Sequence, residues 1–139
     1  LFTWHFIGGV FVAMFVCILH VMVMFHFIGS GKEIKEAVEI LGGDAEVVRR
    51  VRRFKAVVFP FATFAPLFTG AAEILGGGAH TGSLPGWMHW SVGLFSILFN
   101  VVAFPIEYKA LKMNLELLDE VDLKIKRDIS PALWGERES

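Results

Sequence analysis

The sequence predicts an all-α integral membrane protein with three transmembrane helices, a short cytoplasmic amphipathic helix and a C-terminal amphipathic helix. Apolar residues make up 55% of the 139 residues and charged residues only 19%, whereas an average soluble domain has about 45–50% and about 25%. The charges are also segregated, because residues 1–31 carry none and residues 56–106 carry only Glu73. These observations exclude a disordered chain, a nucleic-acid-binding tail and a disulfide scaffold. They indicate a single membrane domain over residues 1–139.

The three transmembrane helices follow from the length of the apolar stretches. A helix needs about 20 apolar residues to cross a hydrocarbon core that is roughly 30 Å thick. Three segments reach this length, and they cover residues 2–28, 54–75 and 84–106. A soluble helical bundle is the alternative, but its helices need wide polar faces. Residues 10–28 are interrupted only by His20 and His26, so the sequence favours the membrane.

The basic residues predict the orientation of the chain. All 13 Lys and Arg residues lie in the blocks 32–55 and 109–137, which follow spans one and three. The loop between spans two and three, residues 76–86, holds none. Short loops rich in Lys and Arg stay on the cytoplasmic side. We therefore expect the N-terminus outside and the C-terminus in the cytoplasm, in a bacterial inner membrane or an organellar inner membrane.

A short amphipathic helix is expected at residues 32–41. Gly42-Gly43 should end it, and Asp44 has the chemistry of an N-cap for a helix that runs from Ala45 into span two. That helix opens with the basic cluster at residues 49–53, RRVRR. We expect this cluster to meet anionic lipid headgroups, and docking of an acidic partner is the alternative.

A second amphipathic helix is expected after span three, which should end near Pro105. It covers residues 107–129, and Ser130-Pro131 should end it. Its apolar stripe consists of Leu111, Leu115, Leu118, Val121 and Ile125. Such a stripe must be buried, so it packs on the 32–41 helix, lies on the membrane surface or pairs with another subunit.

The histidines are the first candidates for function, because ionisable residues in or at the edge of a span are costly and commonly functional. His5 and His89 lie about one turn into spans one and three from the outer side. Glu73 lies near the outer end of span two, and His80 lies in the outer loop. These four residues should converge on one leaflet. His20 lies 15 residues below His5, roughly 22 Å along the helix, and belongs to the inner leaflet.

Haem b is one ligand that this arrangement suits, because two histidines at matched depth can supply both axial ligands of its iron. His5 and His89 form the only such pair in the chain. Residues that suit a flat macrocycle lie beside them, namely Trp4, Trp90, Gly8 and Gly93. The same ligation fits a chlorophyll-type pigment, and His20 would need a ligand from another subunit. Structural roles remain the alternative, since Trp anchors helices at membrane edges and Gly permits close packing.

Two further chemistries are compatible with the outer residues. Glu73 and His80 could serve a quinone, whose headgroup needs a hydrogen-bond donor or a proton-exchanging group near the interface. A copper, zinc or iron site could draw on His5, Glu73, His80 and His89, although compact H-x-x-x-H spacing is absent.

Two polar residues of span three are expected to be structural, Asn100 deep in the span and Glu107 at its inner end. Asn100 should act as a hydrogen-bonding contact between helices. Glu107 should be a solvated residue at the helix end, paired with Arg53 or Lys55.

The segment around His89 reads Trp87-Met88-His89-Trp90-Ser91-Val92-Gly93-Leu94. It resembles the His-bearing helix of di-haem b-type cytochromes and of the membrane anchors of succinate dehydrogenases, which also have three spans. The resemblance covers this one helix, and the Ser-x-x-His-Arg pattern of such anchors is absent. It implies a haem-carrying helix in an electron-transfer complex.

We therefore expect a membrane-anchor subunit of a multi-subunit electron-transfer complex of the respiratory-chain type, which relays electrons rather than catalysing a reaction alone. It should bind haem b between spans one and three, beside a quinone site. Its partners should be other membrane subunits and the lipid bilayer, with no nucleic acid. The alternative is a cofactor-free accessory or scaffolding subunit of a respiratory or photosynthetic complex. A third hypothesis is an autonomous metal-dependent membrane enzyme, although no Walker, G-x-S-x-G or H-E-x-x-H motif occurs.

Overall fold

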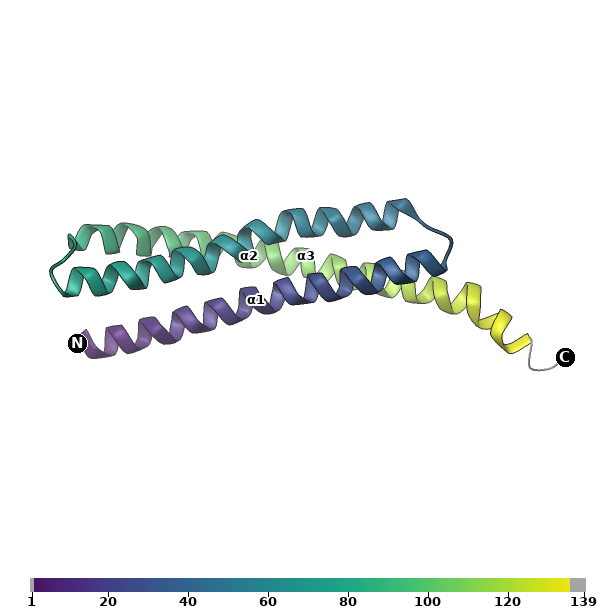
Figure 1. The fold of residues 1–139 in the computed structure, drawn as a ribbon, viewed down its shortest axis with the longest axis horizontal. Coiled ribbons are helices and arrows are strands. Elements are labelled where there is room, and N and C mark those ends of the chain that lie inside the picture. The colour runs from purple at the N-terminus through teal and green to yellow at the C-terminus, as the bar shows by residue number, and fades with distance from the viewer. Residues whose placement is uncertain (1, 136–139) are drawn as a thin grey trace.

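The computed structural model describes residues 2–135, and these residues form three long helices and no strand. The helices are α1 (Phe2–Ile40), α2 (Ala45–His80) and α3 (Gly86–Gly135). Consecutive helices run antiparallel, and each helix contacts the other two. α3 continues past the α1–α2 connection (Figure 1). We call the end of the bundle with the α2–α3 connection the turn end. The end with the α1–α2 connection and residues 49–53 is the basic end.

All three helices are long and apolar enough to cross a membrane, which confirms the predicted all-α class and the number of candidate spans. Large apolar side chains lie exposed along them, including Phe11, Phe15 and Phe25 of α1. A continuous apolar surface of this kind is typical of a face that contacts lipid or another protein. α3 has 50 residues and is about 75 Å long, more than twice the thickness of the hydrocarbon core.

The predicted separate helix at residues 32–41 is wrong, because α1 continues without a break to Ile40. Each Gly costs only about 1 kcal/mol relative to Ala in a helix, so Gly29 and Gly31 need not end it. Packing favours continuation, since Gly31 lies close to α2. A β-carbon added at Gly31 would lie 3.2 Å from a methyl group of Val51.

The predicted helix ends near Pro105 and Ser130-Pro131 are also wrong, because α3 runs through both prolines to Gly135. A proline inside a helix removes one backbone hydrogen bond and clashes with the carbonyl four residues earlier. Tertiary packing supports the helix on both sides of Pro105, where Ala103 and Glu107 are both buried.

The connection between α1 and α2 follows the prediction. Gly42 and Gly43 both have φ of +89°, a conformation that ends α1 and that side chains other than Gly rarely adopt. The Asp44 side chain accepts a hydrogen bond of 2.9 Å from the backbone N–H of Glu46, so it caps α2 as expected.

The hydrophobic core is concentrated toward the basic end. Its members recur at three- and four-residue steps on all three helices, and they include Phe27, Ile34, Val47, Val51, Val58, Leu117 and Val121. The C-terminal half of α3 therefore packs on α1 and α2, one of the three predicted possibilities. Four of the five predicted stripe residues lie in this core or against it, namely Leu111, Leu118, Val121 and Ile125. The prediction is wrong at Leu115, which is 47% exposed, and it omits Leu117, which is 0% exposed.

Ion pairs join the charged stretches of α2 and α3 at the basic end, outside their apolar segments. Arg50 donates a 2.9 Å hydrogen bond to Glu120, and Lys124 lies 3.5 Å from the same carboxylate and 3.8 Å from Asp44. The hydrogen bond from Arg50 is the main reason why the pKa of Glu120 lies below its ordinary value, and Lys124 also lowers it.

Acid should weaken this contact. A carboxyl group with a lowered folded-state pKa stabilises the protein above its unfolded-state pKa of about 4.3, and this contribution is lost as pH falls through the folded-state pKa. Both side chains are about two-fifths exposed, so the effect should stay below about 1 kcal/mol. We expect Glu120→Gln to reduce the loss of thermal stability between about pH 5 and pH 3. Glu116→Gln, at an exposed position of the same helix, should leave that loss unchanged.

Candidate functional site

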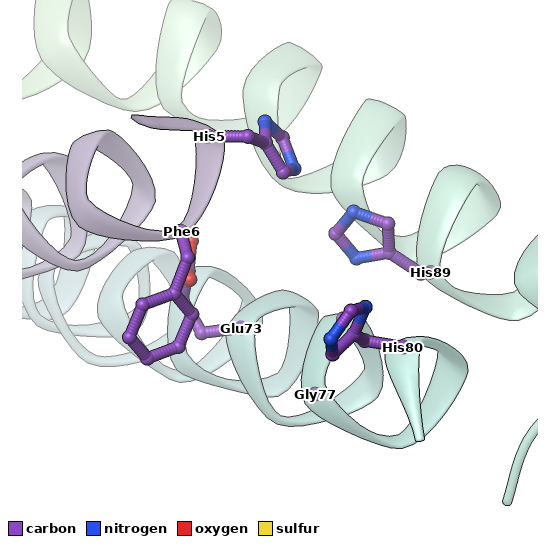
Figure 2. Close-up of a pocket in the computed structure, with 7 residues that line it drawn as sticks. His5, Phe6, Glu73, Gly77, His80 and His89 are labelled. Atoms are coloured by element: carbon purple, nitrogen blue, oxygen red, sulfur yellow. The ribbon is translucent and has the colours of Figure 1, made fainter. Parts of the chain in front are cut away.

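A cavity of about 200 Å³ lies between the three helices at the turn end. His5 and Phe6 of α1, Glu73, Gly76, Gly77 and His80 of α2, and His89 of α3 line it (Figure 2). The structure thus brings together the four polar residues that the sequence assigns to one leaflet. Depth along the helices is sufficient to predict this convergence. Glu73, His80 and His89 lie within a few turns of the α2–α3 connection, and His5 lies at the start of α1, which is at the same end of the bundle.

His89 is held by a hydrogen bond from its Nδ1 to the backbone carbonyl of Ala72, at 3.0 Å. A carbonyl oxygen can only accept, so the Nδ1 carries a proton, and a metal could bind only the Nε2. Gly76 allows the ring to lie against α2, since a β-carbon there would be 3.0 Å from His89 Cε1.

His5 lies beside His89, and the ring centroids are 6.0 Å apart with an interplanar angle of 80°. Figure 2 shows the two imidazoles facing the same space from α1 and α3, with Glu73 and His80 approaching from α2. The site therefore combines two imidazoles with a carboxylate and a third histidine around a small cavity.

Glu73 packs its carboxylate against Gly9 of α1. A β-carbon added at Gly9 would lie 2.8 Å from both carboxylate oxygens, whereas one added at Gly8 would meet no atom within 4 Å apart from its own helix backbone. Gly9 rather than Gly8 thus provides the close approach between α1 and α2.

This difference gives a matched pair of substitutions. Ala is preferred over Gly in a helix, so Gly8→Ala should raise the free energy of unfolding by about 0.4–1 kcal/mol. Gly9→Ala should give a smaller gain or a loss, because the added methyl group displaces the Glu73 carboxylate. Chemical denaturation in detergent measures both variants. An equal gain at the two positions would contradict the packing of Glu73 on Gly9.

The other residues that the sequence assigns to a macrocycle do not line the cavity. Trp4 and Trp90 are 80% and 77% exposed, although the Trp90 ring lies 6.2 Å from the His89 ring. Gly93, like Gly8, has open space where a β-carbon would stand. No group of three or more His, Cys, Asp or Glu side chains in residues 2–135 is arranged to hold a metal ion, so nothing in the described residues supports the alternative copper, zinc or iron site.

A second polar site lies deep between the helices and was not predicted. His20 of α1 is 0% exposed, and its Nδ1 lies 2.8 Å and 3.0 Å from the two carboxylate oxygens of Glu107 of α3. The expectation that Glu107 is solvated and paired with Arg53 or Lys55 is therefore wrong, since Glu107 is only 3% exposed. The His20 ring also stacks on Phe104, with centroids 5.0 Å apart.

Asn100 connects this pair to a second buried cluster. Its Nδ2 donates to the backbone carbonyl of Ser96 at 2.8 Å and to Thr69 Oγ1 at 3.2 Å, and its Oδ1 faces His20 Nε2 at 3.1 Å. Thr69 Oγ1 and Ser96 Oγ lie 3.0 Å apart. The expected role of Asn100 as a hydrogen-bonding contact between helices is confirmed.

The network determines the protonation of the His20–Glu107 pair. Because the Ser96 carbonyl can only accept, the Asn100 amide is oriented with its oxygen toward His20, and His20 Nε2 must donate. A bare Nδ1 and a carboxylate are both acceptors and would repel at 2.8 Å. One proton is therefore shared between them, and the pair is neutral overall. Both ring nitrogens of His20 are occupied, so His20 offers none to iron in this arrangement.

A smaller polar cluster surrounds Asn114, which lies seven residues after Glu107 on α3, toward the basic end. His26 Nε2 lies 3.1 Å from Asn114 Oδ1. The Nδ2 of Asn114 and the Oγ of nearby buried Ser30 have no hydrogen-bond partner among the described residues. The sequence signal that reveals these clusters is the seven-residue spacing of Asn100, Glu107 and Asn114, which places all three on one face of α3.

No known protein family, curated protein or solved structure matches this chain. The candidate function therefore depends on the chemistry of the two polar sites.

Proposed function

We propose that this chain is the membrane-anchor subunit of a multi-subunit electron-transfer complex, and that it binds haem b through His5 and His89. The observation that carries this proposal is the 6.0 Å distance between their ring centroids. Metal–imidazole bonds are near 2.0 Å long, so an iron between two imidazole nitrogens separates the ring centroids by roughly 6 Å. His5 and His89 would therefore be close enough to hold one haem between them.

The hydrogen bond of His89 supports the same role. Histidines that bind metals almost always donate their second ring N–H to a carbonyl or carboxylate, which orients the ring and increases its basicity. His89 has this bond, with Ala72 as the acceptor, so Nε2 is the ring nitrogen that would bind the metal. Haem would supply one-electron chemistry, and these residues would hold and orient it.

The size of the cavity limits how a macrocycle could be bound. Pockets that bury a drug-sized ligand measure roughly 300–1,000 Å³, and the cavity here has about 200 Å³. A macrocycle would therefore extend beyond it toward the membrane, and the open space beside Gly8 and Gly93 is compatible with that. Exposed Trp4 and Trp90 would lie near its edge or anchor the helices at the interface.

A quinone headgroup is the second candidate ligand, and the small size and polar lining of the cavity support it. A quinone ring is much smaller than a macrocycle, and the cavity presents a carboxylate, Glu73, and the imidazole of His80 for hydrogen bonding and proton exchange. Gly77 leaves open space in the lining, since a β-carbon there would meet no atom within 4 Å, whereas Gly76 is covered by the His89 ring.

The proposed orientation follows the basic residues. Those before and at the start of α2 lie at the basic end, which would face the cytoplasm, and the cavity would face the outer leaflet of a bacterial or organellar inner membrane. The exposed apolar surfaces of the helices would contact lipid and the other membrane subunits.

Absorption spectra of the purified protein, oxidised and then reduced with dithionite, test the haem proposal. We expect a bis-histidine b-type spectrum at one haem per chain, and its loss in His5→Ala and His89→Ala. His26→Ala is the matched control, because it removes a histidine at the opposite end and should leave the spectrum unchanged. A wild-type protein without Soret and α bands would overturn the proposal and favour the cofactor-free accessory subunit.

The quinone site is tested separately, by binding of a quinone analogue followed through quenching of the tryptophan fluorescence. We expect Glu73→Gln and His80→Gln each to weaken binding by about tenfold, the equivalent of one hydrogen bond to a charged or polarised group. Gly8→Ala should not affect it. Equal binding by all variants would exclude this cavity as the quinone site.

A further inference from the structure

A larger cavity, of about 470 Å³, lies between α2 and α3 at the basic end. Its lining has two parts. Arg50, Arg53 and Lys109 supply positive charge, and apolar side chains supply a surface that includes Phe54, Val57 and Met113. The volume lies within the range of roughly 300–1,000 Å³ typical of sites for small ligands.

The cavity lies where both helices change from charged to apolar sequence. On α2, the basic residues 49–53 directly precede the apolar segment 54–75. On α3, the apolar segment 84–106 directly precedes Lys109. Positive charge and apolar surface therefore meet at one level on two helices, as they do at the boundary between lipid headgroups and acyl chains.

The charges in this cavity are incompletely neutralised. Arg50 donates to Glu120 at 2.9 Å, which fixes its guanidinium at the edge of the cavity. Among residues 2–135, no acidic side chain forms an ion pair with Arg53 or Lys109. Glu107 precedes Lys109 by two residues, but it is buried against His20 of α1. It therefore does not neutralise the positive charge of Arg53 or Lys109.

We propose that this cavity binds one anionic glycerophospholipid, with its phosphate between Arg53 and Lys109 and an acyl chain along Phe54, Val57 and Met113. Basic pockets between transmembrane helices on the cytoplasmic side bind acidic phospholipids by the same combination of charge and apolar surface. The Arg guanidinium suits phosphate oxygens because it can donate two parallel hydrogen bonds. The apolar lining at membrane level favours a lipid over an acidic protein segment. The inference is independent of any haem or quinone.

Native mass spectrometry of the full chain, purified in a neutral detergent and titrated with phosphatidylglycerol or phosphatidylcholine, tests the proposal. We expect one tightly bound phosphatidylglycerol per chain and weak binding of phosphatidylcholine. Arg53→Gln with Lys109→Gln should weaken phosphatidylglycerol binding roughly 30-fold, the equivalent of about 1 kcal/mol for each cation. All four charged positions in the variants and controls are exposed, so folding should be preserved and is checked by a thermal scan.

The matched control is Arg49→Gln with Arg52→Gln, which also removes two positive charges but from positions of the basic cluster that do not line this cavity. It should change the affinity less than threefold. Val57→Trp fills the cavity without changing the charge and should also reduce binding. Equal losses in the two double variants, equal affinity for the two lipids, or displacement of phosphatidylglycerol by an equimolar amount of inorganic phosphate would each overturn the proposal.

Discussion

Glu107→Ala is expected to lower the free energy of unfolding by about 3–5 kcal/mol, because it leaves a buried imidazole without its partner. His20 is 0% exposed and Glu107 3% exposed, and their shared proton keeps the pair neutral. Without the carboxylate, His20 must lose a hydrogen bond or its proton in an environment with no water to replace either. Chemical denaturation of the purified protein in detergent measures this loss.

Two further variants separate the charge from the hydrogen bond. Glu107→Gln keeps an oxygen near His20 Nδ1 and should cost less than Glu107→Ala. His20→Phe combined with Glu107→Leu removes both polar groups and should recover much of the stability, because a buried ion pair can often be replaced by apolar residues at little cost. A double variant that is less stable than Glu107→Ala alone would show that Glu107→Ala loses stability through packing rather than through the unpartnered imidazole.

The apolar spans could be predicted from sequence because the thickness of hydrocarbon sets a minimum length for any crossing helix. The helix ends could not be predicted in the same way. Gly29, Gly31 and Pro105 are local helix breakers, with costs of about 1 kcal/mol for Gly and about 3 kcal/mol for Pro. Packing of one helix against two others outweighs such costs, and that packing is a property of the whole bundle rather than of a local segment.

The sequence predicts the depth of each site residue along its helix, but it does not predict the rotation of each helix about its own axis. The rise of about 1.5 Å per residue is sufficient to bring His5, Glu73, His80 and His89 to one level. Which side chains face one another depends on the direction in which each helix face points. Pro105 predicts the end of span three and so predicts a solvated Glu107, whereas the continuous α3 buries Glu107 against His20. The seven-residue repeat of polar residues on α3 contained the missing information.

Leu117→Ala is expected to lower the free energy of unfolding by about 2–5 kcal/mol, as truncations of buried leucines do. Leu117 is 0% exposed and belongs to the core at the basic end. It lies in the charged half of α3, beyond the apolar segment 84–106, so its burial removes apolar surface from water. Inside hydrocarbon the same burial would gain little from the hydrophobic effect, because lipid tails are as apolar as Leu.

Leu115→Ala is the matched control for this prediction, because it makes the same chemical change two residues away on a side chain that is 47% exposed. It should change stability by no more than about 0.5 kcal/mol. The pair also distinguishes the observed seam from the one expected from sequence, which included Leu115 and omitted Leu117. A larger loss at Leu115 than at Leu117 would mean that α3 is rotated relative to α1 and α2. Such a rotation would also separate His20 from Glu107, because both contacts depend on the same buried face of α3.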